Sequence, residues 1–146
     1  MDITNPAGFQ NRFLSRFLDF IITFLITGIL SQLLYGGFYD GNHYYLTDLF
    51  GVLYYLLLPI LWHGYTIGRR MAGNRIVRVD GRKLGIGTML LRDLVAGIIY
   101  ALTLGIGLIV SAFMIGIRED KRALHDFIAQ TYVTTDPPST FKNSEQ

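Results

Sequence analysis

The sequence contains no cysteine, which excludes disulfide bonds, thiolate nucleophiles and cysteine-based metal sites. Charged residues are also scarce, at 16% of the 146 residues, whereas 51% are hydrophobic. A disordered chain shows the opposite balance, and an ordinary soluble domain carries about 25% charged residues. The composition therefore favours an integral membrane protein.

The apolar residues are gathered into three blocks, at 17–35, 46–61 and 94–117. Each block is near or above the roughly 20 residues that a helix needs to cross a bilayer. We expect the first two to form transmembrane helices, over about 12–35 and 46–63. The first block is not expected to be a cleaved signal peptide, because it is long, contains Asp19 and has no small-residue cleavage site at its exit.

Lysine and arginine are absent from residues 36–45 but crowd the segment between the second and third blocks. The positive-inside rule then predicts a multi-pass protein of the cytoplasmic (inner) membrane, with its N-terminus and this basic segment in the cytoplasm. Because topology explains the basic pI, no nucleic-acid partner is expected. The bilayer itself is the expected partner, its anionic headgroups contacting Arg69, Arg70, Arg75, Arg78, Arg82 and Lys83.

The third apolar block has two interpretations. A single span would carry the basic residues at 118–122 outside the cell, whereas a hairpin of short helices, broken at 103–107, would return them to the cytoplasm. We favour the hairpin. Its arms are too short to cross the bilayer, so its bend needs shielding by the other helices. Gly97, Ala101 and Gly105 would give it a small face for close packing.

The remaining segments predict little further structure. Ile76–Val79, the turn at Asp80-Gly81 and the return at 82–84 predict a small basic cytoplasmic β-hairpin, and 131–134 is strand-like. The polar tail at 136–146 is expected to be disordered. The predicted fold is thus an all-α polytopic membrane protein, with one transmembrane domain over 6–135.

A polar stripe runs along the first predicted helix. Asp19 lies seven residues after Arg12, about two helical turns, so the two share a face. An ionised carboxylate in hydrocarbon costs roughly 2.5 kcal/mol or more, and such a residue is therefore a candidate functional site. Steps of three or four residues continue the stripe, which comprises Arg12, Arg16, Asp19, Thr23, Thr27 and Ser31.

Several short motifs follow one another along the chain in a characteristic order. They are Gly8-Phe9 with Arg12, Ser15 and Asp19; Thr66-Ile67-Gly68-Arg69-Arg70 with Gly73, Arg75, Ile76 and Val77; Asp80-Gly81; Arg92; and Leu124-His125-Asp126 with Ala129 and Thr131. Over residues 6–135 this pattern resembles the RDD family of membrane proteins, named for one arginine and two aspartates. The resemblance places those three residues at Arg12, Asp19 and Asp126. Two positions depart from it: the usual Gly-Lys is Gly68-Arg69, and the usual Ala-Gly is Ala129-Gln130.

The resemblance implies a role in transport of an ion or small ligand, sodium–proton exchange being one version, or an accessory or scaffold role in a membrane complex. In the first case Arg12, Arg16, Asp19 and Asp126 form an ion or proton site. Asp19 would then titrate or bind a monovalent cation. In the second case they form a structural clasp, in which Arg12 bridges both aspartates. The candidate supporting residues are Thr23, Thr27, Arg92 and His125.

Enzyme chemistry is not expected. The sequence has neither a Ser-His-Asp spacing nor an H-E-x-x-H helix, and Gly68-Arg69-Arg70 lacks the ending of a nucleotide-binding loop. The predicted topology separates the histidines, so no metal site and no cofactor are expected. Because the chain has few helices for a permeation path, we expect a homo-oligomer or a larger membrane complex.

Overall fold

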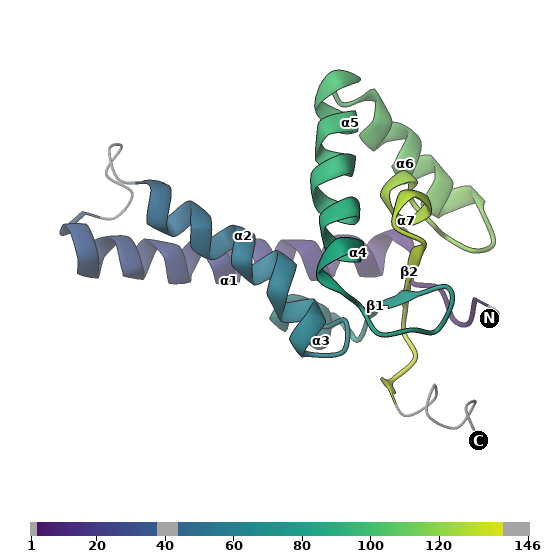
Figure 1. The fold of residues 1–146 in the computed structure, drawn as a ribbon, viewed down its shortest axis with the longest axis horizontal. Coiled ribbons are helices and arrows are strands. Elements are labelled where there is room, and N and C mark those ends of the chain that lie inside the picture. The colour runs from purple at the N-terminus through teal and green to yellow at the C-terminus, as the bar shows by residue number, and fades with distance from the viewer. Residues whose placement is uncertain (1–2, 38–43, 139–146) are drawn as a thin grey trace.

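The computed structural model describes residues 3–37 and 44–138, apart from the side chains of residues 44–47. Two helices, α1 (Phe9–Tyr35) and α2 (Tyr44–Leu61), lie side by side and run in opposite directions (Figure 1). The other elements gather at the end of this pair where α1 begins, and the last described residues lie near that end too. The molecule therefore has a helical arm and a mixed end.

Helix α1 is polar on its inner face and apolar on its outer face. Its buried residues are Arg12, Ser15, Asp19, Thr23, Thr27, Gly28 and Ser31. Large apolar side chains such as Phe13 and Phe20 are exposed. This inversion suits a helix surrounded by lipid, and it confirms the predicted stripe except at Arg16, which is exposed. Within the described chain, α1 is the single helix that alone is long and apolar enough to cross a bilayer.

The third apolar block is sharply bent. The helical segments α4 (Ile86–Leu90), η1 (Leu91–Val95) and α5 (Ala96–Leu102) follow one another without a break. The chain then turns through 119° into α6 (Ile106–Ile117). The turn needs left-handed backbone at Leu104 (φ 54°) and Gly105 (φ 84°), which glycine adopts without strain. The predicted break near 103–107 is confirmed.

The two arms of the bend touch through residues that were not predicted. The hydroxyls of Tyr100 and Ser111 are 2.9 Å apart, and a Cβ at Gly107 would lie only 2.9 Å from the Tyr100 ring. By contrast, Gly97 and Ala101 are exposed, so the predicted packing face is wrong. The reason is that α6 packs against the face of α5 that carries Tyr100, and Gly97 and Ala101 lie on another face.

A two-stranded antiparallel sheet joins distant parts of the sequence. Strand β1 (Arg75–Arg78) pairs with β2 (Thr131–Thr134), with Ile76 opposite Val133. The prediction that this strand pairs with residues 82–84 is therefore wrong, because its antiparallel partner is β2. After β1 the chain turns at Asp80-Gly81 as predicted, but residues 82–84 then lead to α4. Both strands are largely buried, which favours the apolar pairing of Ile76 with Val133 over a basic return strand.

The chain ends meet at this sheet. Ala7 donates its backbone N–H to Val133, and Asp136 accepts hydrogen bonds from Thr4 (2.6 Å) and Asn5 (2.7 Å). Asp136 is thus bound, although the sequence placed it in the disordered tail; residues 139–146 lie outside the described part. A small apolar core lies beneath, formed by Ala7, Ile76, Met89 and Val133.

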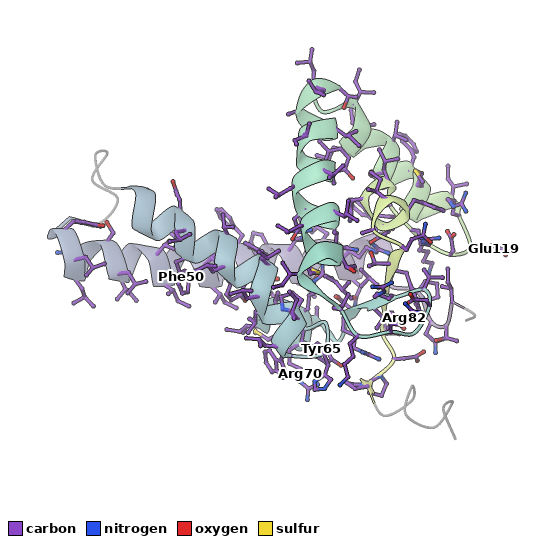
Figure 2. All side chains as sticks on the ribbon, viewed as in Figure 1. Phe50, Tyr65, Arg70, Arg82 and Glu119 are labelled. Atoms are coloured by element: carbon purple, nitrogen blue, oxygen red, sulfur yellow. The ribbon has the colours of Figure 1, made fainter. Side chains whose placement is uncertain are left out.

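Polar side chains concentrate at the mixed end of the molecule. Arg70, Arg82 and Glu119 lie there, whereas Phe50 lies on α2 among side chains that are nearly all carbon (Figure 2). The last two elements to be placed are α3 (Ile67–Ala72), which packs on α1, and α7 (Leu124–Ile128), which packs on η1. These two short helices position the candidate site.

Candidate functional site

The two aspartates highlighted by the sequence are both buried, but they lie in different clusters. Asp19 is 1% exposed and Asp126 is 0% exposed. Each carboxylate is surrounded by donors, and the donors differ in kind. We call these groups the Asp126 cluster (Arg12, Arg92, Arg122, Ala123, Asp126 and Thr131) and the Asp19 cluster (Asp19, Tyr54, Thr66 and Gly68).

Asp126 is held by two arginines. Arg12 donates from Nη1 to Oδ2 at 2.6 Å, and Arg92 donates from Nη1 to Oδ1. The backbone N–H of Ala123 adds a bond of 3.0 Å to Oδ2. Burial alone would raise the pKa of Asp126, but the charges of Arg92 and Arg12 outweigh it and hold that pKa well below the ordinary value. Asp126 is therefore ionised at neutral pH, and both of its carboxylate oxygens accept hydrogen bonds.

Arg12 joins three segments of the chain. Its Nε donates to the carbonyl of Ala7 at 3.0 Å, Nη1 binds Asp126, and Nη2 donates to the carbonyl of Lys121. With all three nitrogens engaged, Arg12 does not bridge to Asp19 as the clasp hypothesis predicted. Arg92 supplies the second guanidinium instead, because η1 packs directly against α7.

Arg92 was expected as a supporting residue, whereas Arg122 and Thr131 were not expected in the Asp126 cluster. Arg92 also donates to the hydroxyl of Thr131 at 2.6 Å. Arg122 donates from Nε to the carbonyl of Thr131 at 3.0 Å, and its guanidinium lies over the ring of Phe127. The signal in the sequence was Arg122, which lies close to the His-Asp motif. The positive-inside argument used this residue only to predict on which side of the membrane the segment lies.

His125 belongs to a side branch of this cluster. Its Nδ1 is 2.7 Å from the hydroxyl of Tyr100, and its Nε2 is 3.7 Å from Asp126. Burial lowers the pKa of His125 to about 3, and nearby Arg92 adds to that effect. His125 is therefore a neutral ring that links α7 to the bent pair.

Asp19 is held by neutral donors from three elements. The hydroxyl of Tyr54 on α2 donates at 2.7 Å, the hydroxyl of Thr66 at 2.5 Å, and the backbone N–H of Gly68 in α3 at 2.8 Å. Within the described residues, no arginine or lysine lies within ion-pair distance of this carboxylate. Tyr54 is the partner that sequence reasoning missed; a mid-span tyrosine needs a partner for its hydroxyl.

Gly68 is needed for the close contact between α3 and α1. A Cβ there would lie 2.4 Å from the carbonyl oxygen of Ser15 and 2.6 Å from the backbone nitrogen of Asp19. Thr66 caps α3 by accepting from Arg69 N while donating to Asp19. The Thr-x-Gly spacing thus places a hydroxyl and an N–H on one carboxylate.

The other stripe residues do not converge on Asp19. Thr23 and Thr27 donate to the carbonyls of Asp19 (2.8 Å) and Thr23 (2.7 Å), one turn earlier on their own helix. Arg16 points out of the cluster, with its guanidinium 5.9 Å from the ring of Tyr55. These residues line a separate space.

That space is a groove of about 1390 Å³ between the α1–α2 pair and the bent segment. Its walls are mainly apolar, including Phe13, Phe20, Leu94 and Ile109. Charged side chains also border it, and among them are Arg12, Arg16, Arg69, Arg92 and Asp93. The groove thus combines a long apolar surface with a cluster of arginine side chains.

The predicted headgroup-binding residues divide into two sets. Arg70, Arg82 and Lys83 are exposed, and Arg78 is partly exposed and paired with Asp80 at 2.6 Å. Arg69 and Arg75 are buried instead. Arg75 donates to the carbonyls of Asp136 and His63, so it fastens the C-terminal segment. The sequence could not separate the two sets, because the burial of Arg69 depends on α3 packing against α1 and that of Arg75 on the β1–β2 pairing.

Sequence comparison adds a family to this geometry. The profile of the RDD family matches residues 6–130, nearly the whole chain. An uncharacterized protein of Bacillus subtilis (strain 168), YckC, is 46% identical over 138 residues, which cover 94% of this chain and 90% of that protein. A search of solved structures gives no match.

Proposed function

The chain belongs to the RDD family of membrane proteins, and we propose that it acts as a non-transporting accessory or scaffold subunit of a membrane complex. One observation carries this proposal: both aspartates of the motif are saturated by fixed donors. A carboxylate that binds a transported cation must release its partners in each cycle. Here that release would leave two buried guanidinium groups unpaired at Asp126, at a cost of about 3–5 kcal/mol.

The motif residues then work as two clasps. The Asp126 cluster ties the start of α1 to α7, η1 and the loop before α7, and the Asp19 cluster ties the middle of α1 to α2 and α3. Together they fix the position of the α1–α2 pair relative to the bent segment, which fixes the shape of the groove between them. A rigid groove bounded by apolar helices is suited to holding another molecule of the membrane.

The proposed setting is the cytoplasmic membrane, with several crossings and the N-terminus in the cytoplasm. The bent segment supports it, because the chain after α6 returns to the basic end where α4 starts (Figure 1). Single cysteines replacing Asp40 and Asp120 can test this in the cysteine-free chain, although residue 40 lies outside the described part. A membrane-impermeant thiol reagent added outside should label D40C alone, and labelling of both would reject this topology.

Flux measurements test the non-transporting role. Purified protein in liposomes that contain a pH-sensitive dye should show no proton movement when sodium or potassium gradients are applied. Extraction into native nanodiscs should give a particle larger than one 16.5 kDa chain plus lipid. Cation-driven proton flux by the purified protein would overturn the proposal, whichever carboxylate variant abolishes it.

A second candidate function is ion or proton transport, including sodium–proton exchange. The observation that favours it is Asp93, a partly buried carboxylate that borders the groove and accepts no hydrogen bond from the described residues. It is the free acid that a proton or cation carrier needs, and Asp19 and Asp126 are not. In this case D93N, and not D19N, should abolish flux in the same liposomes.

A further inference from the structure

A buried positive charge in α3 has no ion-pair partner among the described residues. Arg69 is 4% exposed, and its Nη1 donates to the neutral amide oxygen of Asn74 at 3.0 Å. No carboxylate of the described residues lies within 4.0 Å of its guanidinium. Buried charges in proteins are normally paired, and arginine does not escape by losing its proton. Asp19 attracts the guanidinium of Arg69 only from beyond ion-pair distance, so an anion in direct contact with it would have to come from outside the described residues.

Two further arginines share this region. Arg16 and Arg92 border a small cavity together with Arg69, and all three also border the large groove. Arg92 is buried, and its Nε has no hydrogen-bond partner in the part of the chain that the structure describes, although Nη1 binds Asp126. Arg16 is exposed and pairs with no described carboxylate. Burial and the neighbouring arginines lower the pKa of Arg69 well below its ordinary value, which indicates a surplus of positive charge.

The carboxylates nearby offset this surplus only in part. Asp19 keeps its negative charge, because its three donors are neutral, and it borders the small cavity. Asp126 is shared between Arg12 and Arg92. Four arginines in this region thus face three carboxylates, those of Asp19, Asp93 and Asp126. Asp93 also borders both spaces, and it opposes an incoming anion. It provides a sensitive control, because an anion and a cation respond to its removal in opposite directions.

The groove determines which anion fits. Its volume of about 1390 Å³ exceeds the roughly 300–1,000 Å³ of pockets for small ligands. Its walls carry phenylalanine and aliphatic side chains, and the arginines lie near the start of α1. A ligand that matches both features has a charged head and long apolar chains. In the proposed topology, the arginines face the cytoplasmic leaflet, where anionic lipids attract basic residues.

We propose that the groove binds one anionic glycerophospholipid, with its phosphate at Arg16, Arg69 and Arg92 and its acyl chains along the apolar walls. The phosphate supplies the missing counter-charge to Arg69. The planar guanidinium of Arg69, in place of the family's usual lysine, can offer two parallel N–H bonds to phosphate oxygens. This assignment is independent of the accessory role, since a transporter could hold the same lipid.

Native mass spectrometry of the detergent-purified full chain tests the assignment, with phosphatidylglycerol and phosphatidylcholine of identical acyl chains as probes. We expect one bound phosphatidylglycerol, held at least about tenfold more tightly than phosphatidylcholine, because the choline group carries a positive charge that the three arginines repel. Inorganic phosphate at the same concentration should not displace it. Equal retention of both lipids, or displacement by phosphate alone, would overturn the assignment.

Variants locate the phosphate. R16Q changes an exposed side chain and should fold, and it should weaken phosphatidylglycerol binding by about tenfold; R69Q should do the same if it folds. The matched control is R118Q, which removes a surface arginine whose side chain is 47% exposed and which does not border the groove, and it should change affinity less than twofold. D93N should tighten binding. If R16Q behaves like R118Q, or D93N weakens binding, or the purified chain is a dimer that excludes lipid, the proposal fails.

Discussion

The two buried aspartates reach the same burial by opposite means. Asp126 is stabilised by positive charge, through Arg12 and Arg92, whereas Asp19 is stabilised by the hydroxyls of Tyr54 and Thr66 and a backbone N–H. The first arrangement balances charge across distant segments. The second places a carboxylate among neutral dipoles within the helical arm. The difference teaches that the motif is not one functional triad but two clasps with different sensitivities.

The largest expected effect is the loss of charge at Asp126. D126N leaves Arg12 and Arg92 buried without their counter-ion, which should reduce the free energy of unfolding by about 3–5 kcal/mol. Thermal unfolding in detergent, followed by circular dichroism, measures this change. D80N is the matched control, because it breaks an exposed Arg–Asp pair that contributes only about 0–1 kcal/mol. Similar losses in the two variants would remove the contrast between buried and exposed pairs.

The Asp19 clasp should be broken more effectively through the backbone of α3 than through its carboxylate. In G68A the new Cβ would meet the backbone of Ser15 and Asp19, so α3 must move away at a cost of about 1–3 kcal/mol. G87A places a methyl group on α4 with no atom within 4 Å, and should be neutral or slightly stabilising. Denaturant midpoints of the two variants make the test, and a stable G68A would contradict the close contact.

His125 makes the Asp126 side of the molecule sensitive to acid. The unfolded chain binds a proton on this ring near pH 6.5, whereas the folded protein does so only near pH 3. Between these values the unfolded state carries the extra proton, so stability falls as pH falls, by at most about 1.4 kcal/mol per pH unit. Melting temperatures of wild type and H125Q between pH 7 and 4.5 should diverge, H125Q being flatter. Parallel curves would show that the ring titrates freely in the fold.

A milder loss is expected from D19N. The amide oxygen can still accept from Tyr54 and Gly68, and the amide nitrogen can donate to the hydroxyl of Thr66 once that hydroxyl rotates. We expect about 1 kcal/mol, the usual contribution of one hydrogen bond, and well below the effect of D126N. The same unfolding assay applies to both. Equal losses would show that Asp19 depends on the arginine charges after all.

The smallest effect concerns the turn between α7 and β2. Gln130 has φ 53°, a left-handed conformation that costs a residue with a side chain about 1–2 kcal/mol. Q130G removes that strain but adds freedom to the unfolded chain, which leaves a gain of about 0.5 kcal/mol. A small rise in melting temperature is the expected result. A fall would mean that the bond from the Gln130 side chain to the carbonyl of Phe127 matters more than the strain.

The sequence predicted the helical elements better than it predicted the contacts. Spacing alone placed Arg12, Asp19, Thr23 and Thr27 on one face, and charge placement predicted the bend that the structure has after Leu102. It could not show that Arg12 would bind Asp126 alone and that Arg92, not Asp19, would complete the cluster, because that depends on η1 packing against α7. The register of β1 with β2 was hidden for the same reason. Contacts between residues far apart in sequence leave no local pattern.

One such contact sets the order of events when the protein is made. Arg12 and Asp126 are separated by 114 residues, so the first helix is synthesised long before its counter-charge exists. At a translation rate of about 5–20 residues per second, the delay is on the order of ten seconds. During that time the guanidinium of Arg12 must stay hydrated at the membrane surface or pair with another group. The Arg12–Asp126 ion pair that fixes the first helix therefore forms late in biogenesis. In a chain truncated before residue 126, the first helix should not be fixed in this way.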